Sequence, residues 1–133
     1  MYSKIKKCLK FNRNIVRVQK QNLVFLIQVP YNISILHCYQ NYLTILPHLP
    51  LCVELLAHNN NLHILPDLPL CTKIRCCNIM DCLPDLPECK DFSCHDTVSN
   101  ISGLPLCSKL NYCCNNRQPY PIPINVWSNY KNI

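Results

Sequence analysis

Apolar and polar residues alternate along the chain in a phrase that repeats several times. The two clearest copies, ISILHCYQNYL at residues 33–43 and CVELLAHNNNL at residues 52–62, have apolar residues at positions one, four, six and eleven and an asparagine at position nine. Later copies begin at Cys71, Cys89 and Cys107, so the starts recur at a nearly constant interval. Because side chains of a strand alternate between its faces, positions four and six point one way and positions three, five and seven the other. The pattern predicts short strands near residues 35–38, 54–57, 73–76, 91–94 and 109–112.

A proline-rich phrase precedes most of these copies. LPDLP occurs at residues 65–69 and 83–87, LPHLP at residues 46–50, and the looser ISGLP at residues 101–105. Proline fixes φ and pushes the residue before it into extended backbone, so the phrase predicts a polyproline-like return segment with inward-facing leucines. Each repeat is then one coil of a solenoid whose strands stack into a parallel sheet. The asparagine is expected to bond to backbone groups where the coil turns away from the sheet.

These motifs resemble the leucine-rich repeat (LRR) family, with its template L-x-x-L-x-L-x-x-N-x-L, and in particular its short-repeat members. The LPxLP phrase is similar to that of secreted bacterial effectors, and LxCxxNxL at residues 36–43 resembles repeat proteins of large DNA viruses that infect amoebae. The resemblance covers about residues 30–124. It implies a repeat solenoid with one short parallel β-strand in each short coil, an extended convex side and little helix. It says nothing about a partner.

The pattern is weaker at both ends of the chain. We expect an irregular basic N-terminal cap at residues 1–32, a solenoid of about five coils at residues 33–124, and a C-terminal cap or tail at residues 125–133. The asparagine position also drifts in the later copies. Ile79 matches position nine unless the copy has lost one residue, in which case Asn78 takes that position.

Most of the twelve cysteines fall at repeat positions. Position one holds Cys52, Cys71, Cys89 and Cys107, and position six holds Cys38, Cys76 and Cys94. Position six is shared with Ala57, which indicates a packing position where a free cysteine behaves as a small hydrophobe. The sequence has no apparent signal peptide or membrane-spanning stretch, so we expect reduced thiols and a location in the cytoplasm, or in the host cytoplasm if the chain is viral.

Positions three, five and seven face out of the sheet on its concave side, and they vary from copy to copy. Variable positions on a repeating scaffold are where recognition usually occurs, so we expect a protein partner to bind there. The candidate binding residues are Ile35, His37, Tyr39, Glu54, Leu56, His58, Lys73, Arg75, Asp91 and His95. Their mixture of aromatic, apolar and oppositely charged groups suits a protein segment better than a phosphate backbone.

A metal site is a further hypothesis. Position seven places His58, Cys77, His95 and Cys113 on consecutive coils. Neighbouring strands lie about 4.8 Å apart, so the first three could converge on one ion with Cys113 as a fourth ligand. Four ligands in a line fit a tetrahedron poorly, however, and a polar face that merely contains these residue types is the simpler interpretation. We expect no cofactor.

The net charge of +6 comes largely from the N-terminal region. The basic residues that precede Glu54, the first acidic residue, are Lys4, Lys6, Lys7, Lys10, Arg13, Arg17 and Lys20. A solvated cap is the simplest interpretation, and contact with nucleic acid or an anionic membrane is the alternative. The run lacks the interleaved aromatic residues of a base-stacking platform.

No arrangement typical of catalysis is evident. Cys94, His95 and Asp96 are adjacent, but in a strand Cys94 points inward while His95 points outward, so nucleophile and base are out of reach of one another. The single glycine of the chain excludes a glycine-rich phosphate loop. We therefore expect no enzymatic activity and no small-molecule substrate.

Overall fold

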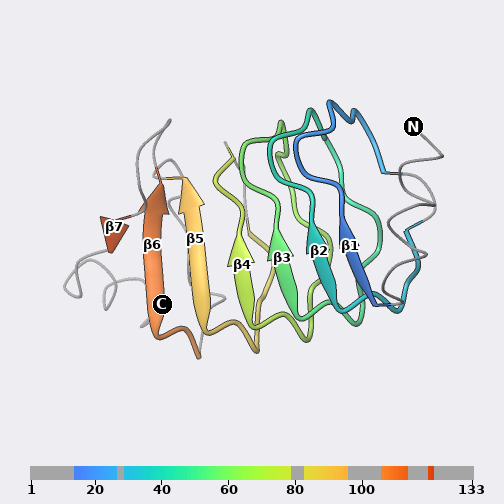
Figure 1. The fold of residues 1–133 in the computed structure, drawn as a ribbon. Helices are drawn as coiled ribbons and strands as arrows, with labels where there is room; N and C mark the ends of the chain where they lie inside the picture. Colours follow the sequence, from blue (N-terminus) through green and yellow to red (C-terminus); the bar gives the residue numbers. More distant parts are fainter. Residues whose placement is uncertain (1–13, 27–28, 79–82, 96–105, 114–119, 122–133) are drawn as a thin grey trace.

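The computed structural model describes residues 14–26, 29–78, 83–95, 106–113 and 120–121 (Figure 1). Within these ranges the chain forms one seven-stranded sheet, in sequence order, and no helix. The strands are β1 (Ile15–Arg17), β2 (Ile35–His37), β3 (Glu54–Leu56), β4 (Lys73–Arg75), β5 (Asp91–His95), β6 (Lys109–Cys113) and β7 (Tyr120–Pro121). Strands β1 to β6 are parallel, and β7 pairs antiparallel with β6.

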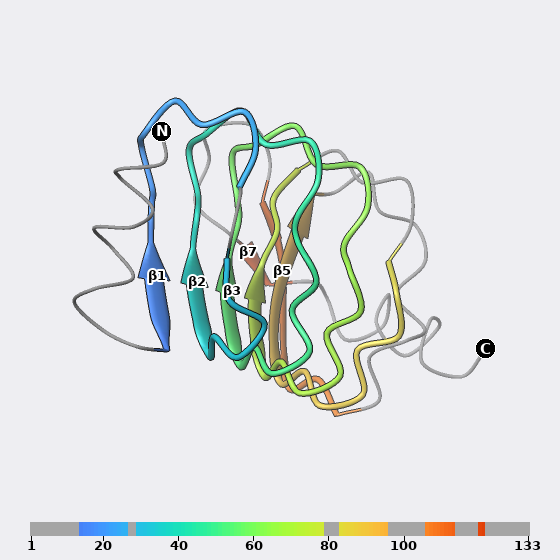
Figure 2. The same cartoon turned by 90° about the vertical axis from the view of Figure 1, so that its right-hand side faces the viewer.

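Successive coils stack into a solenoid, with the strands on one wall and the return segments on the other (Figure 2). The first residues of the parallel strands are in register from β1 to β6: Ile15, Ile35, Glu54, Lys73, Asp91 and Lys109. All five predicted strands are present, and the described return segments contain no helix. The predicted fold class, a repeat solenoid with one short parallel strand per coil, is confirmed.

The core lies between the two walls. From residue 33 to residue 110, positions one, four and six are buried: Ile33, Leu36, Cys38, Cys52, Leu55, Ala57, Cys71, Ile74, Cys76, Cys89, Phe92, Cys94, Cys107 and Leu110. The opposite wall contributes Leu49, Leu68 and Leu86, the second leucine of each proline phrase, all with fully buried side chains. Full burial of a leucine is worth about 1.5–3 kcal/mol, so each phrase fastens the convex wall to the core.

The sheet extends into the segment that the sequence assigned to an irregular cap. Ile15–Arg17 forms β1 in parallel register with β2, and Val16, Val18 and Leu23 are buried in the shared core. This coil escaped prediction because it is slightly longer than the coils that follow and because Gln21, not asparagine, stands at position nine. The predicted domain boundaries otherwise stay predictions.

The described C-terminal part also differs from expectation. Residues 120–121 lie near the end of the predicted solenoid, and they form β7, which pairs antiparallel with β6 through Tyr112↔Tyr120 and Asn111↔Pro121. The antiparallel polarity shows that β7 is not another coil of the repeat.

Candidate functional site

An asparagine follows each of β2, β3 and β4, and its side chain bonds to two coils. The Oδ1 atom of Asn41 accepts hydrogen bonds from the backbone N–H groups of Gln21 and Leu23, both at 3.0 Å. Its Nδ2 group donates to the carbonyls of Val18 and Cys38, both at 2.9 Å. One side chain therefore satisfies four backbone groups in the place where the chain leaves the sheet.

The same arrangement continues through Asn60 and Asn78, and we call these three residues the asparagine ladder. Asn60 donates to the carbonyls of Cys38 and Ala57 at 3.0 and 3.1 Å and accepts from the N–H of Leu43 at 3.0 Å. Asn78 accepts from the N–H of Asn60 at 2.9 Å and donates to the carbonyl of Ala57 at 2.9 Å. Asn78 therefore occupies position nine, and of the two alternatives that the sequence left open, this copy has lost one residue.

The missing residue corresponds to a left-handed corner in the preceding coils. Position eight is Lys20, Gln40 and Asn59 in the first three coils, with φ values of 56°, 55° and 56°. In the shortened coil, the N–H of Asn78 instead donates to the carbonyl of Cys76. The coil thus closes with one residue less while its asparagine stays in place.

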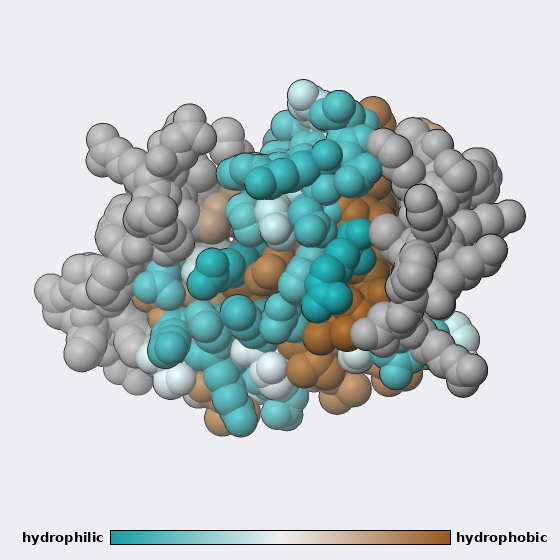
Figure 3. Space-filling view, viewed as in Figure 1, coloured by the Kyte–Doolittle hydropathy of each residue, from teal (hydrophilic) through white to brown (hydrophobic). Residues whose placement is uncertain are grey.

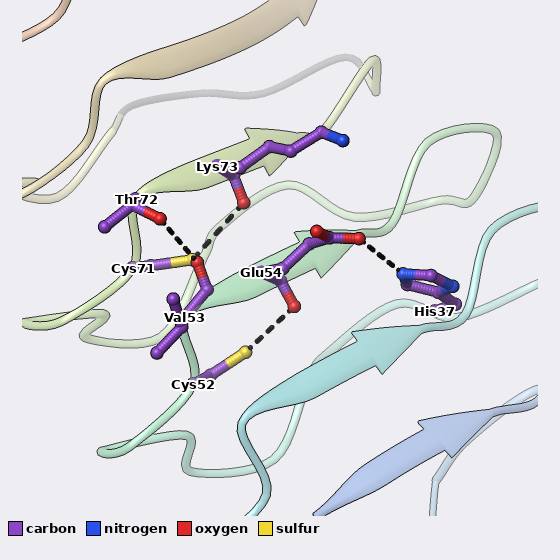
Figure 4. Close-up of polar contacts among 7 residues, drawn as sticks. All are labelled: His37, Cys52, Val53, Glu54, Cys71, Thr72 and Lys73. Atoms are coloured by element: carbon purple, nitrogen blue, oxygen red, sulfur yellow. Dashed lines mark hydrogen bonds and ion pairs between the residues drawn. The ribbon is translucent and has the colours of Figure 1, made fainter.

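The start of each strand from β3 to β6 carries a buried thiol, and we call Cys52, Cys71, Cys89 and Cys107 the thiol ladder. Each Sγ donates to the carbonyl two residues further along the chain, at distances of 3.2, 3.5, 3.6 and 3.2 Å respectively. Figure 4 shows the bonds of Cys52 and Cys71. All four are reduced thiols with buried side chains, as are Cys38, Cys76 and Cys94. The prediction that these seven cysteines pack as small hydrophobes is confirmed.

Burial makes these thiols poor nucleophiles. Desolvation raises the pKa of both Cys38 and Cys89 to about 12, and it raises the pKa of Cys76 as well. Because the thiolate is the reactive form, Cys38, Cys76 and Cys89 should react slowly in the folded chain. Cys52 is the exception, since a side-chain hydrogen bond with Cys71 lowers its pKa.

Between the two ladders, the strands present their concave positions in register. Position three aligns Glu54 with Lys73, Lys73 with Asp91, and Asp91 with Lys109. These opposite charges nevertheless form no salt bridge within the described residues. The Glu54 carboxylate turns to His37 on the neighbouring strand, with 2.7 Å between Oε1 and Nε2 (Figure 4).

An aromatic pair lies next to this contact at position seven. The rings of Tyr39 and His58 stack with centroids 4.6 Å apart and planes 7° from parallel. Partial burial, followed by the charges of Arg75 and His37, lowers the pKa of His58 below its ordinary value of 6.5. His58 is therefore neutral at pH 7, and its Nδ1 atom is buried without a hydrogen-bond partner in the described part of the chain.

The structure brings most of the predicted binding residues onto one surface. We call this surface the concave face: Ile35, His37, Tyr39, Glu54, Leu56, His58, Lys73, Arg75 and Asp91, extended by Ile15, Arg17 and Lys109. His95 lies in β5, but its side chain falls outside the described residues. Ile15 and Arg17 were missed as concave residues because β1 itself was missed, although their alternation around the buried Val16 marks a strand.

The four candidate metal ligands are not assembled by the described structure. Cys77 is disulfide-bonded, which departs from the expectation of reduced thiols and means that its sulfur is not a thiolate ligand. The side chains of His95 and Cys113 lie outside the described residues. Across the described ranges, no group of three or more His, Cys, Asp or Glu residues could hold a metal ion. The metal hypothesis is therefore not carried further.

The predicted basic segment is described only at its end. Lys4, Lys6, Lys7, Lys10 and Arg13 lie outside the described residues. Arg17 lies in β1 beside His37, and Lys20 lies at the left-handed corner that follows β1. The two described members thus belong to the first coil of the solenoid.

Comparison with known proteins supports the repeat fold. No protein-family model matches the chain, and no curated protein matches it. Among solved structures, an LRR domain of a Shigella effector superimposes with a TM-score of 0.75 and 28% sequence identity, over 92% of this chain and 59% of that one. The chain is an LRR-like repeat protein.

The match agrees with the resemblance of the LPxLP phrase to bacterial effectors, while the resemblance to viral repeat proteins stays a prediction. This LRR-like chain spans about 59% of the length of the solved effector domain. No helix within its described residues is long and apolar enough to cross a membrane.

Proposed function

We propose that this LRR chain is a non-enzymatic scaffold that binds a protein partner on its concave face. The observation that carries the proposal is a contrast within each strand. Position four is leucine, isoleucine or phenylalanine from β2 to β6, whereas positions three, five and seven change chemical class from coil to coil. A uniform core beneath a varied surface is the arrangement expected when the scaffold is fixed and the surface is used for recognition.

The concave face is also ordered before any partner arrives. Its backbone is held in parallel register, the Tyr39 and His58 rings are stacked, and His37 is bonded to Glu54. Side chains that are already positioned lose less conformational entropy on binding. Structural similarity to an effector LRR domain supports a scaffold, and the activity of the whole effector is not transferred to this chain.

The proposal is tested by affinity capture with the full chain and two matched variants. The concave variant carries Tyr39→Ala, His58→Ala and Arg75→Ala. The convex variant carries His48→Ala, Asp67→Ala and Asp85→Ala, which are positions in the return segments. We expect at least one protein to be retained by the wild type and by the convex variant and lost by the concave variant.

Both variants are expected to fold, because surface substitutions usually change stability by less than about 0.5 kcal/mol. A concave variant that retains every captured protein overturns the proposal. Loss of capture on neutralising Lys4, Lys6, Lys7 and Lys10, with normal capture by the concave variant, would instead place the site in the basic N-terminal segment. In that case binding should weaken steeply with salt if the target is nucleic acid.

A further inference from the structure

Charge is unevenly distributed between the two walls of the solenoid. Within the described ranges, four basic residues lie in strands at concave positions, Arg17, Lys73, Arg75 and Lys109, against two acidic ones, Glu54 and Asp91. The remaining described acidic residues, Asp67, Asp85 and Glu88, lie in the return segments. The strand wall is therefore cationic, and the convex wall is anionic.

The contacts of Glu54 increase this imbalance. Its carboxylate is hydrogen-bonded to His37 and is turned away from Lys73, although Lys73 is its direct partner across the strands (Figure 4). Among the described residues, the side chains of Lys73, Arg75 and Lys109 form no salt bridge. These three cations, which we call the cationic end of the concave face, are opposed mainly by Asp91.

The other end of the concave face is apolar. Ile15 and Ile35 are paired across β1 and β2, Leu56 follows on β3, and all three side chains are partly exposed. Tyr39, stacked on His58, lies beside them. Figure 3 shows hydrophobic residues gathered over β1 and β2 and hydrophilic residues over β3 and β4. We call Ile15, Ile35, Tyr39 and Leu56 the apolar end.

We propose that the concave face recognises an extended acidic protein segment with one large apolar anchor residue. The anchor lies on the apolar end, and the acidic side chains pair with Lys73, Arg75 and Lys109. This inference rests on the proposed function and specifies the chemistry of the partner.

The spacing of the strands sets the spacing of the recognised residues. From β2 to β4 the distance is about two strand spacings, or about 10 Å, which an extended chain covers in about three residues. From β4 to β6 the distance is the same again. A segment that crosses the strands therefore has acidic residues about three and about six positions from its anchor.

A protein segment fits this surface better than a nucleic acid. Glu54 and Asp91 lie between the basic residues of the concave face, where they would repel a continuous phosphate backbone. A phosphate backbone also offers no counterpart to Ile15, Ile35 and Leu56. An acidic segment with an anchor matches both ends of the surface at once, through charge complementarity and apolar burial.

The test uses a phage-displayed library of random dodecapeptides selected against the immobilised full chain. Enriched sequences are synthesised with a fluorophore, and their binding is measured by anisotropy. We expect enrichment of Asp or Glu about three residues from Leu, Ile, Phe or Trp, in either chain direction. The double variant Lys73→Glu, Arg75→Glu should bind the selected peptides about tenfold more weakly or worse, because attraction becomes repulsion.

Two controls make the result specific to the cationic end. The charge-control variant Asp85→Lys, Glu88→Lys changes the net charge in the opposite direction. It should leave peptide affinity within about twofold, since these positions lie on the other wall. Replacing the acidic residues of the best peptide by lysine should restore binding to the Lys73→Glu, Arg75→Glu variant. Rescue of this kind is not expected if the variant is merely misfolded.

The other outcomes separate this inference from the proposed function. Neutral or basic peptides that bind, and whose binding is lost in the variant Tyr39→Ala, His58→Ala, Arg75→Ala, overturn the acidic segment and leave the concave face as the binding surface. Selected peptides that bind this variant normally overturn both. A selection that yields no binder counts against the acidic segment, and a random-sequence DNA duplex that outcompetes the best peptide shows that the surface takes nucleic acid instead.

Discussion

Strands β3 and β4 begin beside a cysteine of the thiol ladder and end beside an asparagine of the asparagine ladder, and these two ends are held by different chemistry. The asparagine side chains reach into neighbouring coils through hydrogen bonds near 3.0 Å, using both donor and acceptor. Each thiol donates one longer hydrogen bond within its own coil, and Cys107 adds a bond of 3.7 Å to the previous coil. The asparagine end is held by directional hydrogen bonds between coils, whereas the thiol end is held mainly by the packing of buried side chains.

The difference explains which residue types the two ends tolerate. Ile33 replaces cysteine at position one of the second coil and is also fully buried, because this site needs only an apolar side chain of suitable size. Position nine stays asparagine from the second to the fourth coil. Gln21 replaces it only in the first described coil, where its Nε2 group donates to the carbonyl of Gln19.

Replacing a ladder asparagine should cause the largest loss of stability. In Asn60→Ala, the N–H of Leu43 loses its partner. The carbonyls of Cys38 and Ala57 each lose one of two hydrogen bonds and keep those from Asn41 and Asn78. A buried unsatisfied group costs about 1–3 kcal/mol and a lost hydrogen bond about 0.5–1.5 kcal/mol, so we expect a loss of about 2–3 kcal/mol in the free energy of unfolding, measured by chemical denaturation. The neighbouring substitution Asn61→Ala removes an exposed amide and should cost less than about 0.5 kcal/mol. Equal losses in the two variants would show that the ladder bonds contribute little.

The corresponding change at the thiol end should be milder. Cys89→Ala removes one buried sulfur and a hydrogen bond of 3.6 Å, and we expect a loss of about 1 kcal/mol, comparable to deleting one methylene group from a core. In the native wild-type chain, alkylation of Cys71 and Cys89 should be slow, because both are buried and the thiolate is scarce. Rapid modification of either residue before unfolding would contradict the packing role.

A substitution at the left-handed corner should increase the stability of the chain, in contrast to the two substitutions above. Gln40 has a φ of 55°, which costs a non-glycine residue about 1–2 kcal/mol, and glycine avoids this cost at an entropic penalty of about 0.5–1 kcal/mol. Gln40→Gly should therefore stabilise the chain by about 0.5 kcal/mol in thermal or chemical unfolding. Asn61→Gly, at a residue whose φ is not positive, should destabilise it. Destabilisation by both would show that the corner is not a source of strain.

The smallest expected effect is that of pH, which should change the free energy of unfolding through the asparagine end of the strands and not through the thiol end. His58 lies at the asparagine end, where its carbonyl accepts from Asn60, and its pKa is lower in the folded chain than its ordinary value of 6.5. The unfolded chain therefore binds more protons between these two pKa values. The contribution of neutral His58 to the free energy of unfolding is complete above about pH 6.5 and declines as the pH falls below it. At the other end, the raised pKa values of Cys71 and Cys89 keep these two thiols neutral throughout this range.

The pH effect is measured as the denaturation midpoint of the wild type and of His58→Gln between about pH 5 and pH 8, the range in which histidine titrates. The variant should show a smaller decline on the acid side. An identical decline in both proteins would assign the effect to other groups.

The sequence was sufficient to predict the repeat because burial repeats with it. Positions one, four and six must be apolar in each stacked coil, and Asn78 could be placed once one residue was allowed to be lost. β1 was not predicted, because the coil that carries it lacks the asparagine and is slightly longer than the next. The contacts of the concave face were also beyond prediction, since the choice of Glu54 between His37 and Lys73, like the stacking of Tyr39 on His58, depends on side-chain rotamers that a repeat does not constrain.

The antiparallel strand β7 bears on how many coils can assemble. A parallel solenoid is a template for its own growth, because its last strand offers the same unpaired backbone groups as every strand before it. At β6 those groups are partly taken by a strand of reversed polarity that carries Pro121, a residue with no N–H to donate. A further coil, or the first coil of another molecule, would meet a mismatched edge there. In this way β7 acts as a terminator, and it favours discrete solenoids over end-to-end fibres.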